Sequence, residues 1–344
     1  MSKKVVFWGY RYNNMRESWR IQTLWLAEAF RKQGYEIITK DFKCQGLQAR
    51  EYDYRKDNPC DVVIYNHADL SEIRGNVVKA SCTLFMKPTV PTPYHTTLDP
   101  LGYSGYSSIA YKEPDYKDMP EDDVLKFFQT QVPELINRKM TKWGEKKFTE
   151  KPDIPQKDYY LIIGQCKGDS TVTQHDFGDY VSKLSSIIHH LSAIRPGEEI
   201  VLKLHPYTDG ENPKNNYWSG HLMMFNSLSN VTVYKGHSSV HDFLPGCKAV
   251  LLANSGAGIE VMMHRKPIIS WGFPEYHWQT YDLRHLADLD RALDTGSWFV
   301  PGNSDKFLYW YFHHYCFYDQ ASADRKVAEL LKSKFCVNKK DAYL

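Results

Sequence analysis

The chain has 344 residues, of which 42% are hydrophobic and 24% are charged, and its formal net charge is +2. This length suffices for two domains of ordinary size, and the composition is that of a globular protein in water. So small a net charge gives no reason to expect nucleic acid as a partner, whereas local basic patches leave peripheral contact with a membrane surface open.

The first half of the chain alternates between strand and helix patterns. Short apolar runs predict four buried strands, at residues 5–9, 35–39, 61–65 and 82–86. Between the first two, Ser18 can cap a helix whose apolar residues recur at helical spacing, and Gly34 ends it. This alternation predicts a parallel sheet that ends near Met86, with any site beyond the carboxyl ends of its strands.

A loop-rich stretch, a helix and a charged segment follow. Residues 88–114 are rich in Pro, Gly, Tyr and Thr, and they form either the lip of an acceptor site or a long connection packed by its own tyrosines. Residues 121–139 carry apolar side chains on one helical face. Residues 141–158 are charged and contain prolines, which indicates a linker between domains. The first, acceptor-side domain is therefore predicted at residues 1–150.

The second half restarts the same alternation. Its apolar runs predict strands at residues 159–163, 199–204, 231–234, 249–253 and 268–271. The last two strands are joined by a short helix, expected at residues 259–264. Asn254 and Ser255 are good helix caps, and Gly256 and Gly258 would let the backbone bend closely against a ligand. These elements define a second, ligand-binding domain at residues 151–290.

The remaining residues, 291–344, are mostly helical. The aromatic run 307–318 predicts a buried helix that packs back on the first domain, because it is too short to span a membrane. The opening sequence, MSKKVVFWGYRYNN, has an apolar run too short for a signal peptide. Seven cysteines without a CxxC pair favour reduced thiols. We therefore expect a cytoplasmic protein and leave peripheral association with the inner membrane open.

Three loops of the second domain end at the same edge of its predicted sheet. They bring together a carboxylate at residues 165–170, a Lys/His pair at residues 203–206 and a helix start at residues 254–260. Taken singly, each has an ordinary interpretation, as a turn aspartate, a structural histidine or a capped crossover helix. Together they predict a site for an anionic ligand.

At these loops the sequence resembles a known family. The segments GQCKGDSTV (164–172), LKLHP (202–206), SSVHDFL (238–244) and NSGAGIEVMMHRKPIISWGFPEY (254–276) are similar to motifs of bacterial capsular-polysaccharide Kdo transferases. A loop in the first half, TLDPLGYSGY, is similar to a segment of their first domain. The resemblance implies a GT-B fold, in which two Rossmann-like α/β domains face each other across a cleft, and CMP-Kdo as donor. The HP and Asn-Ser pieces also occur in bacterial sialyltransferases, so they indicate the donor class rather than the sugar.

The resemblance also implies catalytic roles. These enzymes retain the configuration of the transferred sugar, which makes Asp169 the candidate nucleophile that forms a transient glycosyl ester, with Gln165 orienting it. Asp99, in the loop of the first domain, is the candidate base for the acceptor hydroxyl. Its alternative role is that of a turn residue before Pro100.

The remaining candidate residues would bind the CMP-sugar. Cationic side chains and helix N–H groups can neutralise the charge that builds on a leaving phosphate, and a carboxylate can hold ribose hydroxyls. The residues implied are Lys203, His205, Asn254, Ser255, Gly256 and, for the ribose, Glu260. We expect no metal and no cofactor, because the three site loops have no Asp-x-Asp pair of the kind that holds an ion beside a diphosphate.

The sequence thus predicts a glycosyltransferase that transfers Kdo, or a related ulosonic acid, from a CMP-sugar to a cell-surface polysaccharide or glycolipid. Two alternatives stay open. One is a sialyltransferase or another nucleotide-sugar transferase on the same scaffold. The other is a non-catalytic module that binds a glycan or nucleotide.

Overall fold

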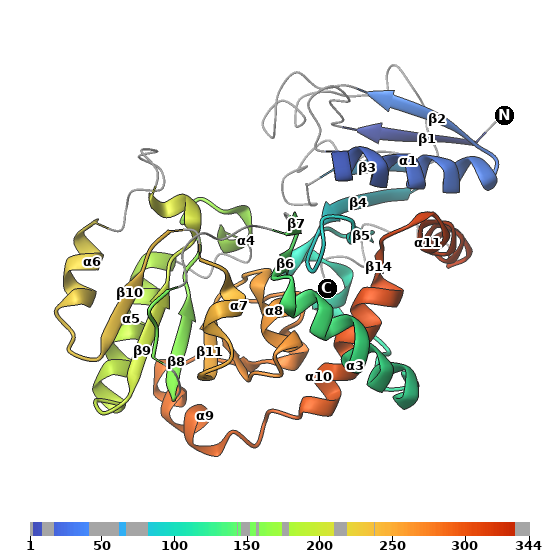
Figure 1. The fold of residues 1–344 in the computed structure, drawn as a ribbon. Helices are drawn as coiled ribbons and strands as arrows, with labels where there is room; N and C mark the ends of the chain where they lie inside the picture. Colours follow the sequence, from blue (N-terminus) through green and yellow to red (C-terminus); the bar gives the residue numbers. More distant parts are fainter. Residues whose placement is uncertain are drawn as a thin grey trace. The chain divides into compact units, whose positions relative to one another are not determined.

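The computed structural model describes residues 3–8, 17–40, 62–66, 82–142, 144–145, 152–155, 158–173, 179–209, 219–236 and 238–333 (Figure 1). The chain divides into two compact units. Unit 1 comprises Met1–Pro114, Thr141–Gly144 and Tyr309–Leu344, and unit 2 comprises Asp115–Met140 and Glu145–Leu308. This division assigns helix 121–137 to unit 2, whereas the boundary expected at residue 150 places it in the first domain.

Unit 1 is built on a six-stranded sheet of order β14-β5-β4-β3-β1-β2. The four strands β1 to β4 pair in parallel. At the other edge of the sheet, β5 pairs antiparallel with β4, and β14 pairs antiparallel with β5. The strands are β1 (Lys3–Trp8), β2 (Tyr35–Lys40), β3 (Val62–Asn66), β4 (Cys82–Pro88), β5 (Thr96–Asp99) and β14 (Cys316–Phe317). The sheet therefore does not end near Met86 as expected, since the chain turns back after β4 and pairs with a segment far along the sequence.

Two helices pack together over the core of unit 1: α1 (Glu17–Lys32) and α11 (Gln320–Lys332). Helix α1 forms because Leu26, Ala27 and Phe30 recur at helical spacing and bury one face against the sheet. It ends at Gly34, whose φ of +83° is costly for any residue with a Cβ. The other elements are η2 (Ser104–Tyr106), α2 (Ser108–Tyr111) and the π-helical η7 (Tyr311–Tyr315). The aromatic run 307–318 is thus a helix end, a π turn and a strand, not one helix.

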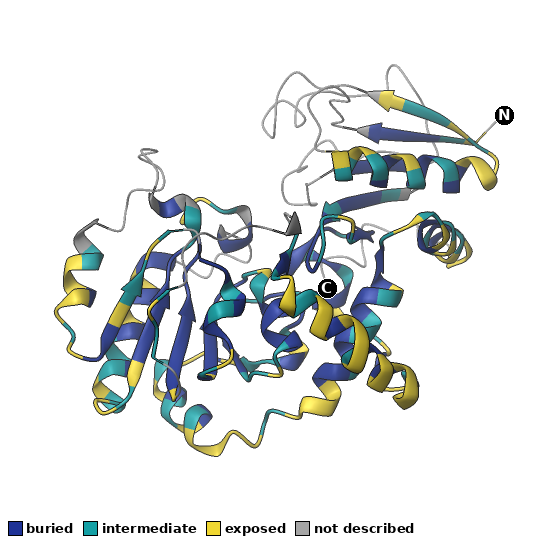
Figure 2. Ribbon diagram, viewed as in Figure 1, coloured by how far each residue is buried: buried dark blue, intermediate teal, exposed yellow. Residues whose placement is uncertain are grey.

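Unit 2 contains a second six-stranded sheet, of order β10-β9-β8-β11-β12-β13, in which every pair is parallel. Its strands are β8 (Tyr159–Ile163), β9 (Glu199–Lys203), β10 (Val231–Tyr234), β11 (Cys247–Leu252), β12 (Ile268–Ser270) and β13 (Tyr281–Asp282). Strands β8 and β12 are buried throughout, and β9 and β11 are buried except at Glu199 and Lys248 (Figure 2). Apolar runs without polar alternation are typical of parallel strands covered on both faces.

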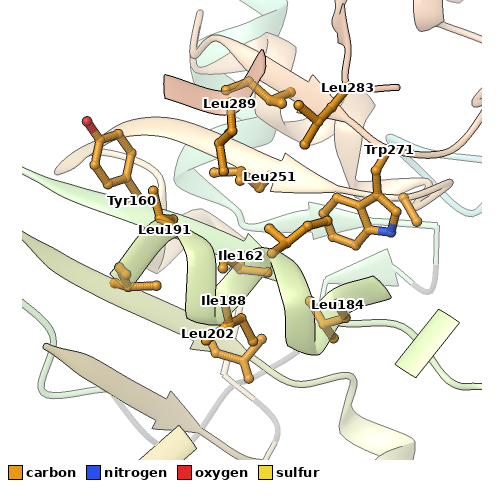
Figure 3. Packing of buried hydrophobic residues seen from close by; sticks show 14 of the residues in the cluster. Tyr160, Ile162, Leu184, Ile188, Leu191, Leu202, Leu251, Trp271, Leu283 and Leu289 are labelled. Atoms are coloured by element: carbon orange, nitrogen blue, oxygen red, sulfur yellow. The ribbon is translucent and has the colours of Figure 1, made fainter. Parts of the chain in front are cut away.

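The helices of unit 2 are α3 (Glu121–Asn137), α4 (Ser170–Thr173), α5 (Tyr180–Ile194), η4 (Pro206–Asp209), α6 (Ser219–Asn226), α7 (Val240–Phe243), α8 (Ala257–Met263), η5 (His277–Gln279), η6 (Leu286–Asp288), α9 (Leu289–Thr295) and α10 (Pro301–Trp310). Most of them lie between the strands of the sheet in the chain, whereas α3 precedes β8 and η6, α9 and α10 follow β13. Figure 3 shows Leu184, Ile188 and Leu191 of α5 packing on one face of the sheet. Two short strands, β6 (Met140–Thr141) and β7 (Gly144–Glu145), pair with each other. The expected α/β class with two Rossmann-like sheets is confirmed.

The strand order of unit 2 reverses between β8 and β11. From β8 the chain moves outward through β9 and β10, then returns to the other side of β8 as β11 and continues through β12 and β13. In such a sheet, the loops after the two strands at the reversal diverge and leave room for a ligand. The loops that follow β8, β9 and β11 contain the residues singled out in the sequence.

Candidate active site

The loop after β8 holds the carboxylate of Asp169 in a fixed orientation. The backbone N–H of Thr171 donates to Asp169 Oδ1 at 3.0 Å, and the Thr171 hydroxyl Oγ1 lies 3.0 Å from the same oxygen. Asp169 also starts the short helix α4, because its carbonyl accepts from the N–H of Val172 at 2.9 Å. The predicted nucleophile is partly buried, and two donors of Thr171 hold its Oδ1.

Gln165 lies buried beneath this aspartate and reaches it through Thr171. Its side-chain Nε2 is 3.2 Å from Thr171 Oγ1, and its Oε1 accepts from the backbone N–H of Asn254 at 2.9 Å. Its own backbone N–H donates to the Tyr180 hydroxyl at 2.7 Å. Thr171, which the sequence analysis did not single out, therefore lies between Gln165 and Asp169. The orienting role of Gln165 stays a prediction.

Asn254 connects the loop after β11 to the loops on either side. Its Nδ2 donates to Thr171 O at 2.8 Å, and its Oδ1 accepts from the N–H of Phe273 at 2.5 Å. A Cβ on Gly272 would lie 2.2 Å from Asn254 Oδ1, so only glycine leaves room for this contact. Asn254 is buried and its amide holds three loops together. Its contact with a donor stays a prediction.

Lys203 is the last residue of β9 and His205 lies two residues after it, next to the β8 loop. Lys203 is 7% exposed, and its Nζ lies 3.4 Å from Leu204 O and 5.8 Å from the centre of the Phe243 ring. His205 is half-buried, with Nδ1 3.4 Å from Cys166 Sγ. Since Asp169 N donates to Cys166 O at 3.0 Å, the cysteine contacts both the histidine and the nucleophile loop.

Cys166 stays a thiol beside this histidine. Burial, with a smaller effect from the nearby Asp169, raises the pKa of the Cys166 thiol from its usual 9.0 to about 11. A protonated thiol can donate to Nδ1, and Nε2 of His205 then carries the ring proton. The imidazole would in that tautomer offer an N–H donor on its far side.

The start of α8 is shaped by Ser255, Gly256 and Gly258. The expected caps, Asn254 and Ser255, lie one or two residues too early, because the helix begins at Ala257 and its cap is Gly256. The Ser255 hydroxyl oxygen accepts from the N–H of Ala257 at 3.2 Å. A Cβ on Gly258 would lie 2.1 Å from the Tyr276 ring, so Gly258 makes room for that tyrosine, whose hydroxyl donates to Ser255 O. Gly256, in contrast, has no described atom within 4 Å of where a Cβ would lie.

Glu260 lies inside α8 and is buried, which differs from the solvent-facing position that a ribose ligand suggests. Burial raises the pKa of Tyr276 well above its ordinary value, and the nearby charges of Glu275 and Glu260 add to the shift. Glu260 therefore lies close to the tyrosine that packs on the helix start. Its role in holding ribose stays a prediction.

Asp99 belongs to unit 1 and has a structural role there. It is 0% exposed, and its carboxylate accepts from the N–H groups of Leu101, Gly102 and Ser108 at 2.8–3.1 Å, from Ser108 Oγ at 2.6 Å and from the Tyr315 hydroxyl at 2.8 Å. A carboxylate enclosed by five donors is poorly placed to take a proton from an acceptor. We therefore replace the expected base role of Asp99 with that of an anchor for the loop 99–108.

The SSVHDFL segment contributes a buried histidine pair. His241 Nε2 lies 3.1 Å from Met140 O, which can only accept, so Nε2 carries the proton and Nδ1 accepts from His264 Nε2 at 2.9 Å. Burial, together with His241, lowers the pKa of His264 from its usual 6.5 to about 3. Burial also lowers the pKa of His241. Both rings are therefore neutral and join α7 to α8.

In the part of the chain that the structure describes, no three or more His, Cys, Asp or Glu side chains gather as metal ligands would. Nor does any helix within the described ranges have the length and apolar character needed to cross a bilayer. The expectation of metal-independent chemistry stays a prediction.

Two α/β units, one of them with polar loops gathered at the reversal of a parallel sheet, define the GT-B class expected from the sequence. The profile of the family described as "Capsule polysaccharide biosynthesis protein" matches residues 98–309, and the chain belongs to this family. The match covers every candidate site residue. It supports the predicted class of a capsule-type glycosyltransferase.

The fold is similar to two solved structures of Thermosulfurimonas dismutans KpsC. The first, titled a beta Kdo 2,4 transferase, has a TM-score of 0.60 and 17% identity over 92% of each chain. The second, titled a beta Kdo 2,7 transferase, has a TM-score of 0.54 and 15% identity over 96% of this chain and 99% of that one. No curated protein sequence matches the chain. At these identities the likeness concerns the fold.

We predict that Asp99→Asn destabilises the protein without acting on the chemistry. The amide turns one acceptor into a donor against buried N–H and O–H groups, which costs about 2–4 kcal/mol in the free energy of unfolding. Urea unfolding should show this loss, and the same change at the exposed Asp118 should leave the midpoint unchanged. An Asp99→Asn protein of normal stability that has lost transfer would restore the base role.

We also predict a pH effect at His264. Between pH 6.5 and about 3 the unfolded chain binds a proton there that the folded protein does not, so the free energy of unfolding falls as the pH falls through this window. His264→Gln keeps a donor to His241 Nδ1 but does not titrate, and it should flatten the dependence measured by urea unfolding from pH 7 to pH 4. His285→Gln, at an exposed position, is the control. Parallel curves for wild type and His264→Gln would contradict the assignment.

Proposed function

We propose that the protein transfers Kdo, or a closely related ulosonic acid, from its CMP-activated form to a cell-surface polysaccharide or glycolipid acceptor, with retention of configuration. The observation that carries the proposal is the arrangement of unit 2. The β8–β11 reversal places the Asp169 loop beside the Lys203–His205 loop and the start of α8. Family membership and the fold shared with the KpsC transferases support the same function.

The proposed reaction proceeds in two displacements. A carboxylate oxygen of Asp169 attacks the anomeric carbon of the donor, and the bond from that carbon to the phosphate oxygen breaks with its electron pair on CMP. The acceptor hydroxyl then attacks the same carbon, loses its proton to a base or to solvent, and releases the aspartate. Two inversions give retention. Asp99 anchors its own loop in unit 1, so this scheme does not use it as the base that takes the proton of the acceptor hydroxyl.

The chemistry of the leaving group suits the cationic and N–H groups nearby. Negative charge grows on the phosphate as the bond breaks, and the ammonium of Lys203 and an N–H of His205 would oppose it. Among the described residues, the backbone N–H groups of Ser255 and Gly256 have no hydrogen-bond acceptor, so they are available to the same anion. No metal is needed in this scheme. We place the reaction in the cytoplasm, where peripheral contact with the inner membrane would bring the enzyme to a lipid-linked acceptor.

The mechanism predicts a covalent sugar on Asp169. Wild-type protein mixed with CMP-Kdo should release CMP and gain the mass of one Kdo unit on the peptide that contains residue 169, as seen by mass spectrometry. Asp169→Asn should lower transfer at least about 10³-fold, because the amide is a poor nucleophile, while CMP affinity changes less than about twofold. Asp118→Asn is the control. Full transfer by Asp169→Asn would remove Asp169 from the mechanism.

The proposed contacts with the phosphate predict variants that bind CMP more weakly but bind cytidine as the wild type does. Lys203→Met and His205→Ala should each weaken CMP binding by about 10–100-fold, the range expected for a charge-assisted hydrogen bond, while the weak binding of cytidine is unchanged. Calorimetry with both ligands checks this, and Lys183→Met, at an exposed position, is the control. Equal losses for CMP and cytidine would show that the two residues act on the fold and not on the phosphate.

The choice of donor distinguishes the proposed Kdo transferase from a sialyltransferase, from another nucleotide-sugar transferase and from a binding module. The His-Pro and Asn-Ser motifs also suit sialyltransferases, so a panel of CMP-Kdo, CMP-sialic acid and UDP-sugars decides the sugar. A module that only binds glycans or nucleotides would release no CMP from any of these donors.

A further inference from the structure

Thr171 lies between the proposed nucleophile and the buried amide of Gln165. It is 7% exposed, and three of its groups form hydrogen bonds with residues of the site. Its N–H and its hydroxyl contact Asp169 Oδ1, both at 3.0 Å, and its carbonyl accepts from Asn254 Nδ2 at 2.8 Å. Thr171 therefore contacts both Asp169 and Asn254.

The direction of each bond follows from its neighbours. Asn254 N–H can only donate, so the Gln165 atom that faces it at 2.9 Å is the carbonyl oxygen Oε1. The Gln165 amide group Nε2 must then face Thr171 Oγ1, at 3.2 Å, and it can only donate. The hydroxyl oxygen accepts this bond, and its single proton points to Asp169 Oδ1.

We propose that Thr171 is a positioning residue for the nucleophile: its hydroxyl and N–H hold Oδ1 of Asp169 and so orient the carboxylate that attacks the sugar. This proposal rests on the proposed function. Two donors on one oxygen fix the rotation of the carboxylate about its Cβ–Cγ bond. The carboxylate loses its negative charge when the ester forms and regains it when the acceptor displaces the enzyme.

The same residue links the nucleophile to the predicted phosphate site. Asn254, which bonds to both Thr171 O and Gln165 Oε1, precedes Ser255 and Gly256 at the start of α8. The position of the attacking oxygen is thereby coupled to the backbone proposed to hold the leaving group. Near-attack geometry requires such coupling, because a shift of about 1 Å between nucleophile and leaving group can cost about 10²-fold in rate.

An alternative is that Asp169 merely caps α4 and that Thr171 supports the turn. A cap needs only the backbone N–H of residue 171, which any residue supplies. The hydroxyl and its orientation by Gln165 are additional, and they are what the experiment changes.

The test compares Thr171→Val, which keeps the shape and removes the hydroxyl, with Thr171→Ser, which keeps the hydroxyl. The rate at which the Kdo–enzyme adduct forms from CMP-Kdo should fall about 10–100-fold in the valine variant. The serine variant should stay within about threefold of wild type. The affinity for CMP should change less than about twofold in both, which a loss of fold would not allow. If the valine variant is insoluble, Thr171→Ala replaces it.

The outcomes separate this proposal from the function on which it rests. A valine variant that forms the adduct at the wild-type rate overturns the role of Thr171 and leaves the transferase intact. Equal losses in the valine and serine variants overturn it as well, because packing and not the hydroxyl would then matter. A wild-type protein that forms no adduct and releases no CMP overturns both.

Discussion

The candidate site depends on the parallel pairing of β8 with β11. Because β8 runs beside β9 on one edge and β11 on the other, three loops leave the sheet at the same end. Loops that cross a buried sheet edge expose backbone groups that must find partners. Here the side chains of Gln165 and Asn254 meet this need, and in doing so they fix the loop that carries Asp169. The hydrogen bonds that complete the fold are therefore the same ones that orient the proposed nucleophile.

Asp99 and Asp169 show that environment, not residue type, decides what a carboxylate can do. Both follow a strand or end one, and both accept hydrogen bonds from residues a few positions ahead. Asp99 is enclosed by donors on both oxygens, including Tyr315 from more than 200 residues away, and serves its own loop. Asp169 is held through Oδ1 and lies partly exposed where three loops meet. A carboxylate that is oriented but accessible suits attack on a sugar, whereas an enclosed one suits an anchor.

Local patterns predicted five of the six strands in the sheet of unit 2, because these five are apolar runs and parallel pairing follows from the helices between them. The sixth, β13, has only two residues and was not predicted. The grouping of the site loops followed from the same rule. The antiparallel pair β5 and β14 was missed because its partners lie far apart in sequence and each is very short. Thr171 carried a weak local signal, the Asp-x-Thr spacing of a capped turn, which is common at helix starts. Its importance depends on Gln165 and Asn254, and that relation exists only in the folded chain.

Two glycines in one motif illustrate what a sequence pattern leaves open. Gly258 is needed because Tyr276 packs where a Cβ would lie, so its reason is inside the protein. Gly256 has a helical φ of −58° and open space above it within the described part of the chain, so neither its conformation nor a described neighbour requires glycine. Under the proposed function, the space at Gly256 is where the donor phosphate would approach the N–H groups of residues 255 and 256. A glycine that no described neighbour requires is then explained by the ligand, and under the same proposal a side chain at position 256 would obstruct the donor.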